Sequence, residues 1–299
     1  MPVQGLLPDW LLSSVAAATI FAVMFDLGLA IVPGDSRWVE KRPVLLAKAL
    51  FSALVAVPAL AWIVMRVFDL PRQVEVGIML MAIAPGAPVA LRRSIGAGGH
   101  RAFAPALQIL LATLAVATMP LSIAALDEYY GGNASIEPHH LARQVLVAQL
   151  VPLATGMLLR RFAARKADWL QPRLDRVAGI LLGILVVLAL VDFWPVVTSA
   201  GPIVSVSIAV VTVLALTAGH LLGGPDPATR TASAISSALR NPGLALLVAS
   251  LNDAPPRITA TIVTYLVVAG LIVLAYVKWR TRAAVLQASA PAVLPRDAD

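Results

Sequence analysis

Charged residues inside long apolar runs are the features of this sequence most able to do chemistry. Apolar sequence lies on both sides of Arg240, and Pro242 and Gly243 follow it closely. A guanidinium cannot be deprotonated in a protein, so it cannot lose its charge to suit a nonpolar environment. We therefore expect Arg240 to face an anion, either the carboxylate of Asp26 or a bound substrate.

A second basic pair, Arg92 and Arg93, lies towards the end of an earlier apolar run. Pro85, Gly86 and Pro88 precede the pair. They predict a break in that run, because proline removes a backbone donor and glycine permits unusual φ values. Two interpretations of the arginines stay open. They either end a membrane span on its cytoplasmic side or add positive charge to the site of Arg240.

Asp26 lies near the middle of the first apolar run, residues 10–32. A charge at the centre of a membrane helix costs about 2.5–3.5 kcal/mol on insertion scales, so such residues are usually paired or functional. Asp26 is therefore either a buried counter-ion that holds helices together or a residue that couples an ion to transport.

Other kinds of chemistry have little support in the sequence. The chain has no cysteine, which excludes disulfides, thiolate metal sites and cysteine catalysis. Its four histidines are scattered without the spacing of metal ligands, so we expect no metal site. No apolar run contains a nucleophile beside a base or a pair of carboxylates, and we expect the protein not to be an enzyme.

The composition is typical of an integral membrane protein. Hydrophobic residues make up 59% and charged residues 13% of the 299 residues, whereas soluble domains carry about 25% charged residues. The formal net charge is +7. The basic residues fall between apolar runs and not on one face, so they fit the positive-inside rule better than a nucleic-acid surface. The expected partner is the lipid bilayer.

About nine apolar runs approach the length of roughly 20 residues that a membrane helix needs. They cover residues 10–32, 44–68, 74–97, 101–126, 141–160, 177–198, 202–222, 229–251 and 257–279. The first run follows no basic segment and precedes no clear cleavage site, so we expect it to be retained as a helix. We expect one transmembrane domain, residues 1–282, and a disordered cytoplasmic tail, residues 283–299.

Loop charges orient these predicted spans. Basic residues gather at 37–42, at 160–176 and at 278–282, and nine spans place all three segments on one side. By the positive-inside rule this side is cytoplasmic. The loop at 127–140 contains acidic residues and no lysine or arginine, and it falls on the opposite side. We expect the N-terminus outside and the C-terminus inside, in the cytoplasmic membrane of a bacterium.

Two of the predicted spans are interrupted, one in each half of the chain. The first interruption is at Pro85, Gly86 and Pro88, and the second is at Pro242 and Gly243. Irregular backbone at membrane depth is tolerated only where protein buries it or where it lines a polar cavity. Paired broken helices therefore indicate the central site of a secondary transporter.

Three runs of this chain resemble helices of the bile acid:sodium symporter family. They are IFAVMFDLGLAIVP, LPRQVEVGIMLMAIAPGAPVALRRSIGAGGHRAFAPALQILLATLAVATMPL and DPATRTASAISSALRNPGLALLVASL. The resemblance implies an all-α membrane fold of nine helices in two inverted repeats. It also implies a core domain around two crossed broken helices, and a panel domain against which the core moves. Members of the family carry bile salts and other organic anions, usually with sodium.

The chain departs from this family at the positions of the sodium ligands. These positions hold, in chain order, Ala90, Leu91, Ala104, Gln108, Ser236 and Arg240. The family's acidic ligand has become Ser236 and its glutamine has become Arg240. A hard cation prefers oxygen ligands with net negative charge, and a guanidinium repels it. We therefore expect sodium binding to be lost, with Arg240 supplying the positive charge in place of the ion.

These observations favour a sodium-independent transporter or facilitator of a small organic anion, with no cofactor. The candidate substrate-binding residues are Arg92, Arg93, Ser94, Gln108, Ser236, Ser237, Arg240 and Asn241. Two alternatives stay open. One is a proton- or sodium-coupled symporter of organic anions, in which Asp26 would carry a coupled proton. The other is a membrane sensor that kept the fold without transporting.

Overall fold

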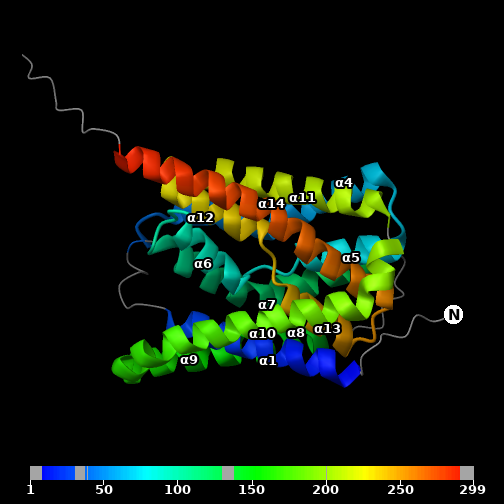
Figure 1. Cartoon of the computed structure of the whole chain (residues 1–299), viewed down its shortest axis with the longest axis horizontal. Helices are drawn as coiled ribbons and strands as arrows, with labels where there is room; N and C mark the ends of the chain where they lie inside the picture. Colours follow the sequence, from blue (N-terminus) through cyan, green and yellow to red (C-terminus); the bar gives the residue numbers. More distant parts are fainter. Residues whose placement is uncertain (1–8, 31–37, 39, 130–137, 200, 290–299) are drawn as a thin grey trace, which may run out of the picture.

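The computed structural model describes residues 9–30, 38, 40–129, 138–199 and 201–289 (Figure 1). Every regular element in these ranges is a helix. In chain order the helices are α1 (Asp9–Leu29), α3 (Pro43–Phe51), the π-helical segment η1 (Ser52–Ala56), α4 (Val57–Phe68), α5 (Arg72–Ala82), α6 (Pro88–Gly96), α7 (Phe103–Tyr129), α8 (Pro138–Val145), the π-helical segment η2 (Leu146–Leu150), α9 (Val151–Phe162), α10 (Ala164–Ser199), α11 (Pro202–Leu222), α12 (Pro227–Ala238), α13 (Pro242–Leu251) and α14 (Pro256–Ser289). The all-helical prediction is therefore confirmed for the described part of the chain.

Seven helical stretches of the described chain are long and apolar enough to cross a membrane. They are Pro43–Phe68, Phe103–Tyr129, His139–Phe162, Ala164–Asp192, Pro202–Leu222, Pro227–Leu251 and Pro256–Ala284. Two predicted spans fall short of this length. The apolar part of α1, Ser13–Leu29, is shorter, and the non-helical residues 83–87 divide α5 from α6. Length alone therefore supports seven spans and not the predicted nine.

Both interruptions occur where proline and glycine predict them. Between α5 and α6, Gly86 adopts a φ of 78°, a conformation that favours glycine, and Pro88 is the first residue of α6. Between α12 and α13, residues 239–241 leave the helical conformation, and Pro242 begins α13 with Gly243 next to it. Each break ends one half-helix and starts another.

The two breaks lie against each other. The backbone N–H of Asn241, in the second break, donates to the carbonyl oxygen of Ala84, in the first, at 2.9 Å. The side-chain oxygen of Asn241 also accepts from the N–H of Leu244 at 3.1 Å and so caps α13. Backbone groups that the breaks release from helical hydrogen bonds are thus satisfied by the opposite break.

Figure 1 shows α1, α9 and α10 along one side of the molecule, and α11, α12 and α14 along the other. On the first side, α1 packs against α9 and α10. Its crossing with α9 is close because both backbones carry glycine there. A Cβ atom on Gly28 would lie 2.3 Å from the carbonyl oxygen of Leu153, and one on Gly156 would lie 2.3 Å from that of Phe25. Small residues of this kind let membrane helices approach each other.

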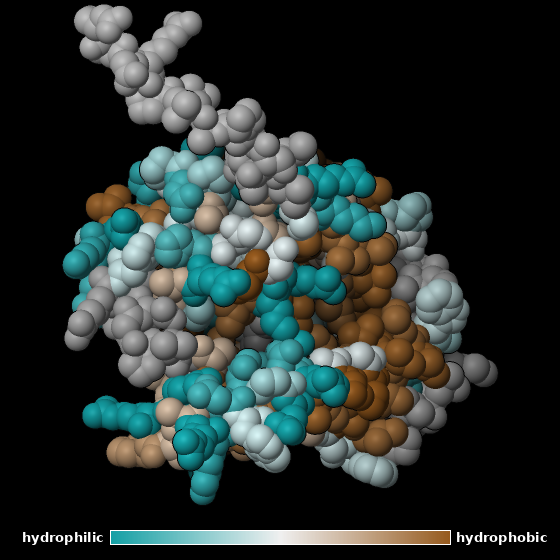
Figure 2. All heavy atoms as spheres, turned by 60° about the vertical axis from the view of Figure 1, so that its left-hand side comes forward, coloured by the Kyte–Doolittle hydropathy of each residue, from teal (hydrophilic) through white to brown (hydrophobic). Residues whose placement is uncertain are grey.

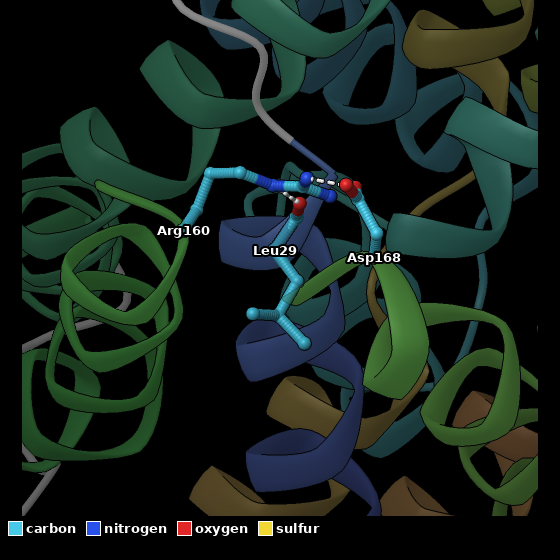
Figure 3. Close-up of polar contacts among 3 residues, drawn as sticks. All are labelled: Leu29, Arg160 and Asp168. Carbon is cyan, nitrogen blue, oxygen red and sulfur yellow. Dashed lines mark hydrogen bonds and ion pairs between the residues drawn. The ribbon is translucent and has the colours of Figure 1, made fainter. Parts of the chain in front are cut away.

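The end of α1 is fixed by an arginine from α9 (Figure 3). Arg160 donates through Nε to the carbonyl oxygen of Leu29 at 2.6 Å, and its Nη1 pairs with Asp168 at the start of α10. The last carbonyl groups of a helix have no partner within the helix, and a basic side chain satisfies them well. Arg160 therefore connects the ends of α1, α9 and α10.

Hydrophilic side chains gather over the end of the molecule that faces the viewer in Figure 2, with hydrophobic side chains beside it. The exposed basic residues near the junction of α9 and α10 include Arg161, Arg165 and Lys166. At the same end, Arg280 of α14 donates to Thr231 Oγ1 at 2.8 Å and to the carbonyl oxygen of Pro227 at 3.0 Å. Helix α14 continues to Ser289, so residues 283–289 are helical and differ from the predicted disordered tail. The rest of that tail, residues 290–299, lies outside the described residues.

Candidate functional site

Arg240 lies in the break between α12 and α13, and its side chain is buried (3% exposed). Its Nη2 donates to the carbonyl oxygen of Ala53 in η1 at 2.9 Å. The guanidinium thus connects the second broken helix to the helical stretch formed by α3, η1 and α4. This contact spans 187 residues of sequence.

The π-helical turn explains why the Ala53 carbonyl is able to accept this bond. In η1 the N–H of Val57 donates to the carbonyl of Ser52 and not to that of Ala53. The next residue, Pro58, has no N–H to offer. The Ala53 carbonyl therefore lacks its usual helical donors, and Arg240 replaces them. Single π-helical turns within α-helices are frequent at functional sites.

Two serines of α12 extend the contacts of this site. Ser236 Oγ accepts a hydrogen bond from Gln108 Nε2 of α7 at 2.8 Å. Ser237 Oγ lies 2.9 Å from Ser52 Oγ of η1. All four side chains are buried. We call the set formed by Ser52, Ala53, Gln108, Ser236, Ser237, Arg240 and Asn241 the crossing site, because it surrounds the meeting point of the two breaks.

Several polar atoms of the crossing site have no hydrogen-bond partner within the described chain. They are Nε and Nη1 of Arg240, Nδ2 of Asn241 and Oε1 of Gln108. The hydroxyl group of Tyr265 is also buried without a partner, and Tyr265 is close enough to Arg240 to interact with it electrostatically. A buried polar group without a partner costs about 1–3 kcal/mol. The free atoms of Arg240 and Asn241 are donors, so the site is suited to an anion or to water.

Asp26 is not the partner of Arg240 that the sequence suggested. Helix α1 ends at Leu29, which places Asp26 in its last turn and not near the middle of a span. The charged groups close enough to act on Asp26 are Asp175 of α10 and Arg92 of α6. For Arg240, the ionisable group within reach is Tyr265. Of the two partners that the sequence suggested for Arg240, the structure does not pair it with Asp26.

The structure does not bring Arg92, Arg93 and Ser94 into the crossing site. Arg92 is exposed and forms a two-pronged ion pair with Asp175, with Nε 2.7 Å from Oδ1 and Nη1 3.0 Å from Oδ2. Arg93 is exposed and Ser94 is buried, both on the half of α6 remote from the break. Of the eight predicted substrate-binding residues, the remaining five are those of α7, α12 and the second break.

A cavity of about 620 Å³ lies between α5, α7, α13 and the start of α14. Its wall is mainly apolar and includes Met79, Leu80 and Val248, and polar residues such as Arg72 and Asn252 lie at its mouth. The wall also includes Ile83, the neighbour of Ala84 in the first break. Arg240 is not among the described residues that line this cavity. The cavity therefore approaches the crossing site without reaching the guanidinium.

The sequence interpretation missed Ser52, Ala53 and Tyr265. The side chain of Ser52 contacts Ser237 of α12, and the backbone carbonyl of Ala53 contacts Arg240 of the second break. Tyr265 belongs to α14. One signal was available, because Pro58 inside an apolar run predicts a local defect in that helix. The sequence did not show that the Ala53 carbonyl is the one left without a helical donor, since this depends on the π-helical hydrogen-bond pattern.

The profile of the Sodium Bile acid symporter family matches residues 17–221, more than half of the chain. This chain belongs to the sodium bile acid symporter family. The resemblance noted in the sequence is thereby confirmed, and the protein is a membrane protein of a transporter family. The match ends before α12, the second break and α13. In that region Ser236 and Arg240 stand where the resemblance places an acidic ligand and a glutamine.

Three similar proteins are named as transporters. The "Probable sodium/metabolite cotransporter BASS3, chloroplastic" of Oryza sativa subsp. japonica is 23% identical over 170 residues, 57% of this chain and 40% of that protein. Its namesake in Arabidopsis thaliana is 22% identical over 171 residues, 57% of this chain and 39% of that protein. The "Uncharacterized sodium-dependent transporter YocS" of Bacillus subtilis (strain 168) is 23% identical over 151 residues, 50% of this chain and 46% of that protein. The matched regions thus span less than half of each relative's own length.

The residues of the crossing site fit a sodium ion poorly. Ser236 stands where the resemblance places the family's acidic ligand, and its oxygen already accepts from Gln108. Ala90 and Ala104, at two further ligand positions, are buried and offer no side-chain oxygen. Arg240, at another of these positions, adds a fixed positive charge and is buried. A hard cation needs several oxygen ligands and is repelled by such a charge.

Proposed function

We propose that this protein is a sodium-independent transporter of a small organic anion. The observation that carries the proposal is the buried Arg240, held on the Ala53 carbonyl in the break of the second broken helix. The guanidinium occupies a position where the family resemblance places a sodium ligand. It supplies a permanent positive charge at that position, whereas relatives of this chain are named as a sodium/metabolite cotransporter and a sodium-dependent transporter.

The electrostatics of the crossing site favour anions over cations. Arg240 has two free donors and Asn241 has one. The first turns of α6 and α13 both begin at the breaks, and helix N-termini carry partial positive charge. The described part of the crossing site contains no carboxylate that would neutralise this field. An anion that reaches the breaks is therefore stabilised without a sodium ion bound beside it.

The cavity offers a path towards the breaks and limits the size of the anion that can bind. A volume of about 620 Å³ lies within the range of about 300–1,000 Å³ for small-molecule pockets. Its apolar wall suits a substrate with an apolar body, and it includes Ile83, the residue before Ala84 of the first break. The proposed pose directs the carboxylate or sulfonate of the substrate towards Arg240, with Asn241, Ser236, Ser237 and Gln108 nearby. We propose that transport requires a movement of the helices that extends the cavity as far as these residues.

We further propose nine membrane passages, with α1 and the α5–α6 pair added to the seven long spans. In this arrangement α1, α8, α9 and α10 form the panel domain, and the helices around the two breaks form the core domain. The two groups of helices in Figure 1 support this division. The basic residues at the junction of α9 and α10 support a cytoplasmic location for that end. The cavity then opens to the outside, and alternating access follows from movement of the core against the panel.

The experiment that tests this function is uptake by proteoliposomes. Purified protein is reconstituted and exposed to a radiolabelled bile salt, monocarboxylate, dicarboxylate and aryl sulfonate, each with inward sodium and with choline replacing sodium. We expect protein-dependent uptake of at least one anion at equal rates in the two solutions. Uptake that stops without sodium contradicts sodium independence, and the absence of uptake for all anions contradicts the transport role.

A further inference from the structure

A second site of interest lies at the end of α1 and away from the crossing site. Asp26 is buried (8% exposed) in the last turn of α1, and its Oδ1 atom has no hydrogen-bond partner within the described chain. Burying a carboxylate oxygen without a partner is costly. Asp26 therefore needs a proton or a positively charged group to be stable in this position.

Its surroundings supply one positive group, but that group is already engaged. Arg92 of α6 forms its two-pronged ion pair with Asp175 of α10. Asp26 is close enough to Asp175 for their carboxyl groups to share a hydrogen bond. An ionised carboxylate only accepts hydrogen bonds, so such a bond requires a proton on one of the two.

The other elements packed against α1 do not change this charge balance. Helix α9 contributes Arg160, which is engaged by Leu29 and Asp168. The sequences of α13 and η2 contain no titratable residue, and those of α7 are confined to its last turn at the opposite end of the helix. Asp26 and the two charged residues that act on it, Asp175 and Arg92, thus form a group of two carboxyls and one guanidinium. This group is neutral only when it holds one proton.

We propose that Asp26 and Asp175 form a proton-binding site that controls the Arg92 bridge between α6 and α10. With the proton bound, the two carboxyls share a hydrogen bond while Asp175 keeps its ion pair with Arg92. Loss of the proton to water leaves two carboxylates that repel each other and compete for Arg92. The exposed position of Arg92 gives water access to the site. Deprotonation therefore loosens the contact of α6 with α1 and α10.

This site connects a proton to the first broken helix. Helix α6 is the second half of that helix and begins at the break, so a change in its contact with α10 reaches the crossing site through the same element. The inference rests on the proposed function in one respect, because it treats separation of α6 from α10 as a step of transport. On that basis the proton is the ion coupled to movement of the anion.

The test measures the separation of α6 and α10 in the full chain without any substrate. Cysteines for spin labels replace Gly96 of α6 and Val177 of α10, and the chain has no cysteine of its own. A Cβ atom on Gly96 meets no heavy atom within 4 Å, and Val177 is exposed. In nanodiscs we expect the distance between the labels to lengthen as the pH rises. A distribution that does not change with pH overturns the proposal.

Variants of Asp26 identify the titrating group. Asp26→Asn mimics the protonated carboxyl, so the short distance should persist at every pH. Asp26→Glu keeps a titrating carboxyl and should keep the transition. Glu128→Gln removes an exposed carboxylate of α7 far from the site and should leave the transition unchanged. If the label distance in Asp26→Asn lengthens with the same pH dependence as in the wild type, another group titrates and the proposal is wrong.

Infrared spectroscopy tests the same assignment on the wild-type protein, so it does not depend on whether a variant folds. The carboxylic acid C=O band should lose intensity over the pH range in which the label distance changes. A distance change without loss of this band overturns the assignment to Asp26 and Asp175. Neither measurement contains sodium or an organic anion. Failure of the proton site is therefore distinct from failure of the proposed anion transport, which the uptake experiment detects.

Discussion

Arg240 is the residue on which the proposed mechanism depends. It is buried, it donates to one backbone carbonyl, and two of its nitrogens have no protein partner. A guanidinium in such a place is costly unless an anion compensates its charge. Since Asp26 lies near Asp175 and Arg92 and not near Arg240, we propose that the substrate supplies the compensating anion at Arg240.

Replacing Arg240 by glutamine tests this charge. Arg240→Gln keeps an amide that can donate to the Ala53 carbonyl, but it removes the positive charge. We expect the apparent affinity for the transported anion to fall roughly ten- to hundredfold, corresponding to about 1.5–3 kcal/mol for a hydrogen bond to a charged group. Arg240→Lys keeps the positive charge, so its apparent affinity for the anion should fall less. The concentration dependence of uptake measures both effects, and equal affinities in wild type and Arg240→Gln would assign the arginine a structural role only.

At the scale of residues, the sequence identified the side chains of the second break but not their partners. Arg240, Ser236 and Gln108 were recognisable because they are polar residues inside apolar runs. Their contacts with Ser52 and Ala53 were not predictable. A serine and a backbone carbonyl carry no special sequence signal, and their availability depends on which helices face each other.

At the scale of elements, the π-helical segment η1 determines which carbonyl Arg240 reaches. The segment η2 has the same organisation, since the N–H of Val151 donates to Leu146 and Pro152 follows. The difference is that η1 faces the second break and η2 faces α1. The two segments therefore form a matched pair, in which one contacts an arginine of the crossing site and the other does not.

Pro58→Ala tests the role of this freed carbonyl. Alanine supplies an N–H that can bond to Ala53 and compete with Arg240. We expect uptake of the anion to fall several-fold while the melting temperature stays equal or rises, because proline in a helix interior is about 3 kcal/mol less favourable than alanine. Pro152→Ala makes the same change in η2 and should leave uptake unaffected. A Pro58→Ala protein with wild-type uptake would show that the freed carbonyl has no role.

The crossing of α1 with α9 provides a test of packing. Gly156→Ala places a methyl group 2.3 Å from the carbonyl oxygen of Phe25, so the two helices must separate. We expect a loss of stability of about 1–3 kcal/mol, as for overpacked cores. Gly183→Ala in α10 is the control, because its Cβ meets no heavy atom within 4 Å. Thermal denaturation in detergent should show a lower melting temperature for Gly156→Ala alone, and equal values would rule out the close crossing.

The sequence predicted most elements and failed where local pattern was insufficient. Apolar length located the long spans, and proline with glycine located both breaks. The end of α1 at Leu29 was missed, which placed Asp26 too deep. The continuation of α14 to Ser289 was also missed. The small polar residues of this tail indicate disorder, but its alanines favour helix. The π-helical turns change the helical period too little to appear as a pattern.

At the scale of the whole molecule, orientation follows from the distribution of charge. The chain has no cysteine, so single cysteines report accessibility without background. Arg257→Cys at the start of α14 and Lys166→Cys near the start of α10 are both exposed positions. We expect a membrane-impermeant maleimide to label position 257 in intact cells, and position 166 only after permeabilisation. The reverse pattern would contradict the positive-inside assignment.

Composition was sufficient to predict a membrane protein, and the motifs were sufficient to predict the family. The relative packing of helices was not predictable, since no periodicity in the sequence specifies that Arg92 meets Asp175 or that Asn241 meets Ala84. These contacts between distant segments define both the crossing site and the proposed proton site. They are the contacts on which the proposal of a sodium-independent carrier and the proposal of a proton site both rest.

The central claim is that Arg240 takes the place of sodium at the crossing of the broken helices. Sodium titration by isothermal calorimetry tests it most directly, with purified wild type, Arg240→Gln and the double variant Arg240→Gln/Ser236→Glu. We predict no saturable sodium heat for the wild type or for Arg240→Gln, which still lacks a carboxylate, and saturable binding for the double variant, which regains one. Saturable sodium binding by the wild type would contradict the account.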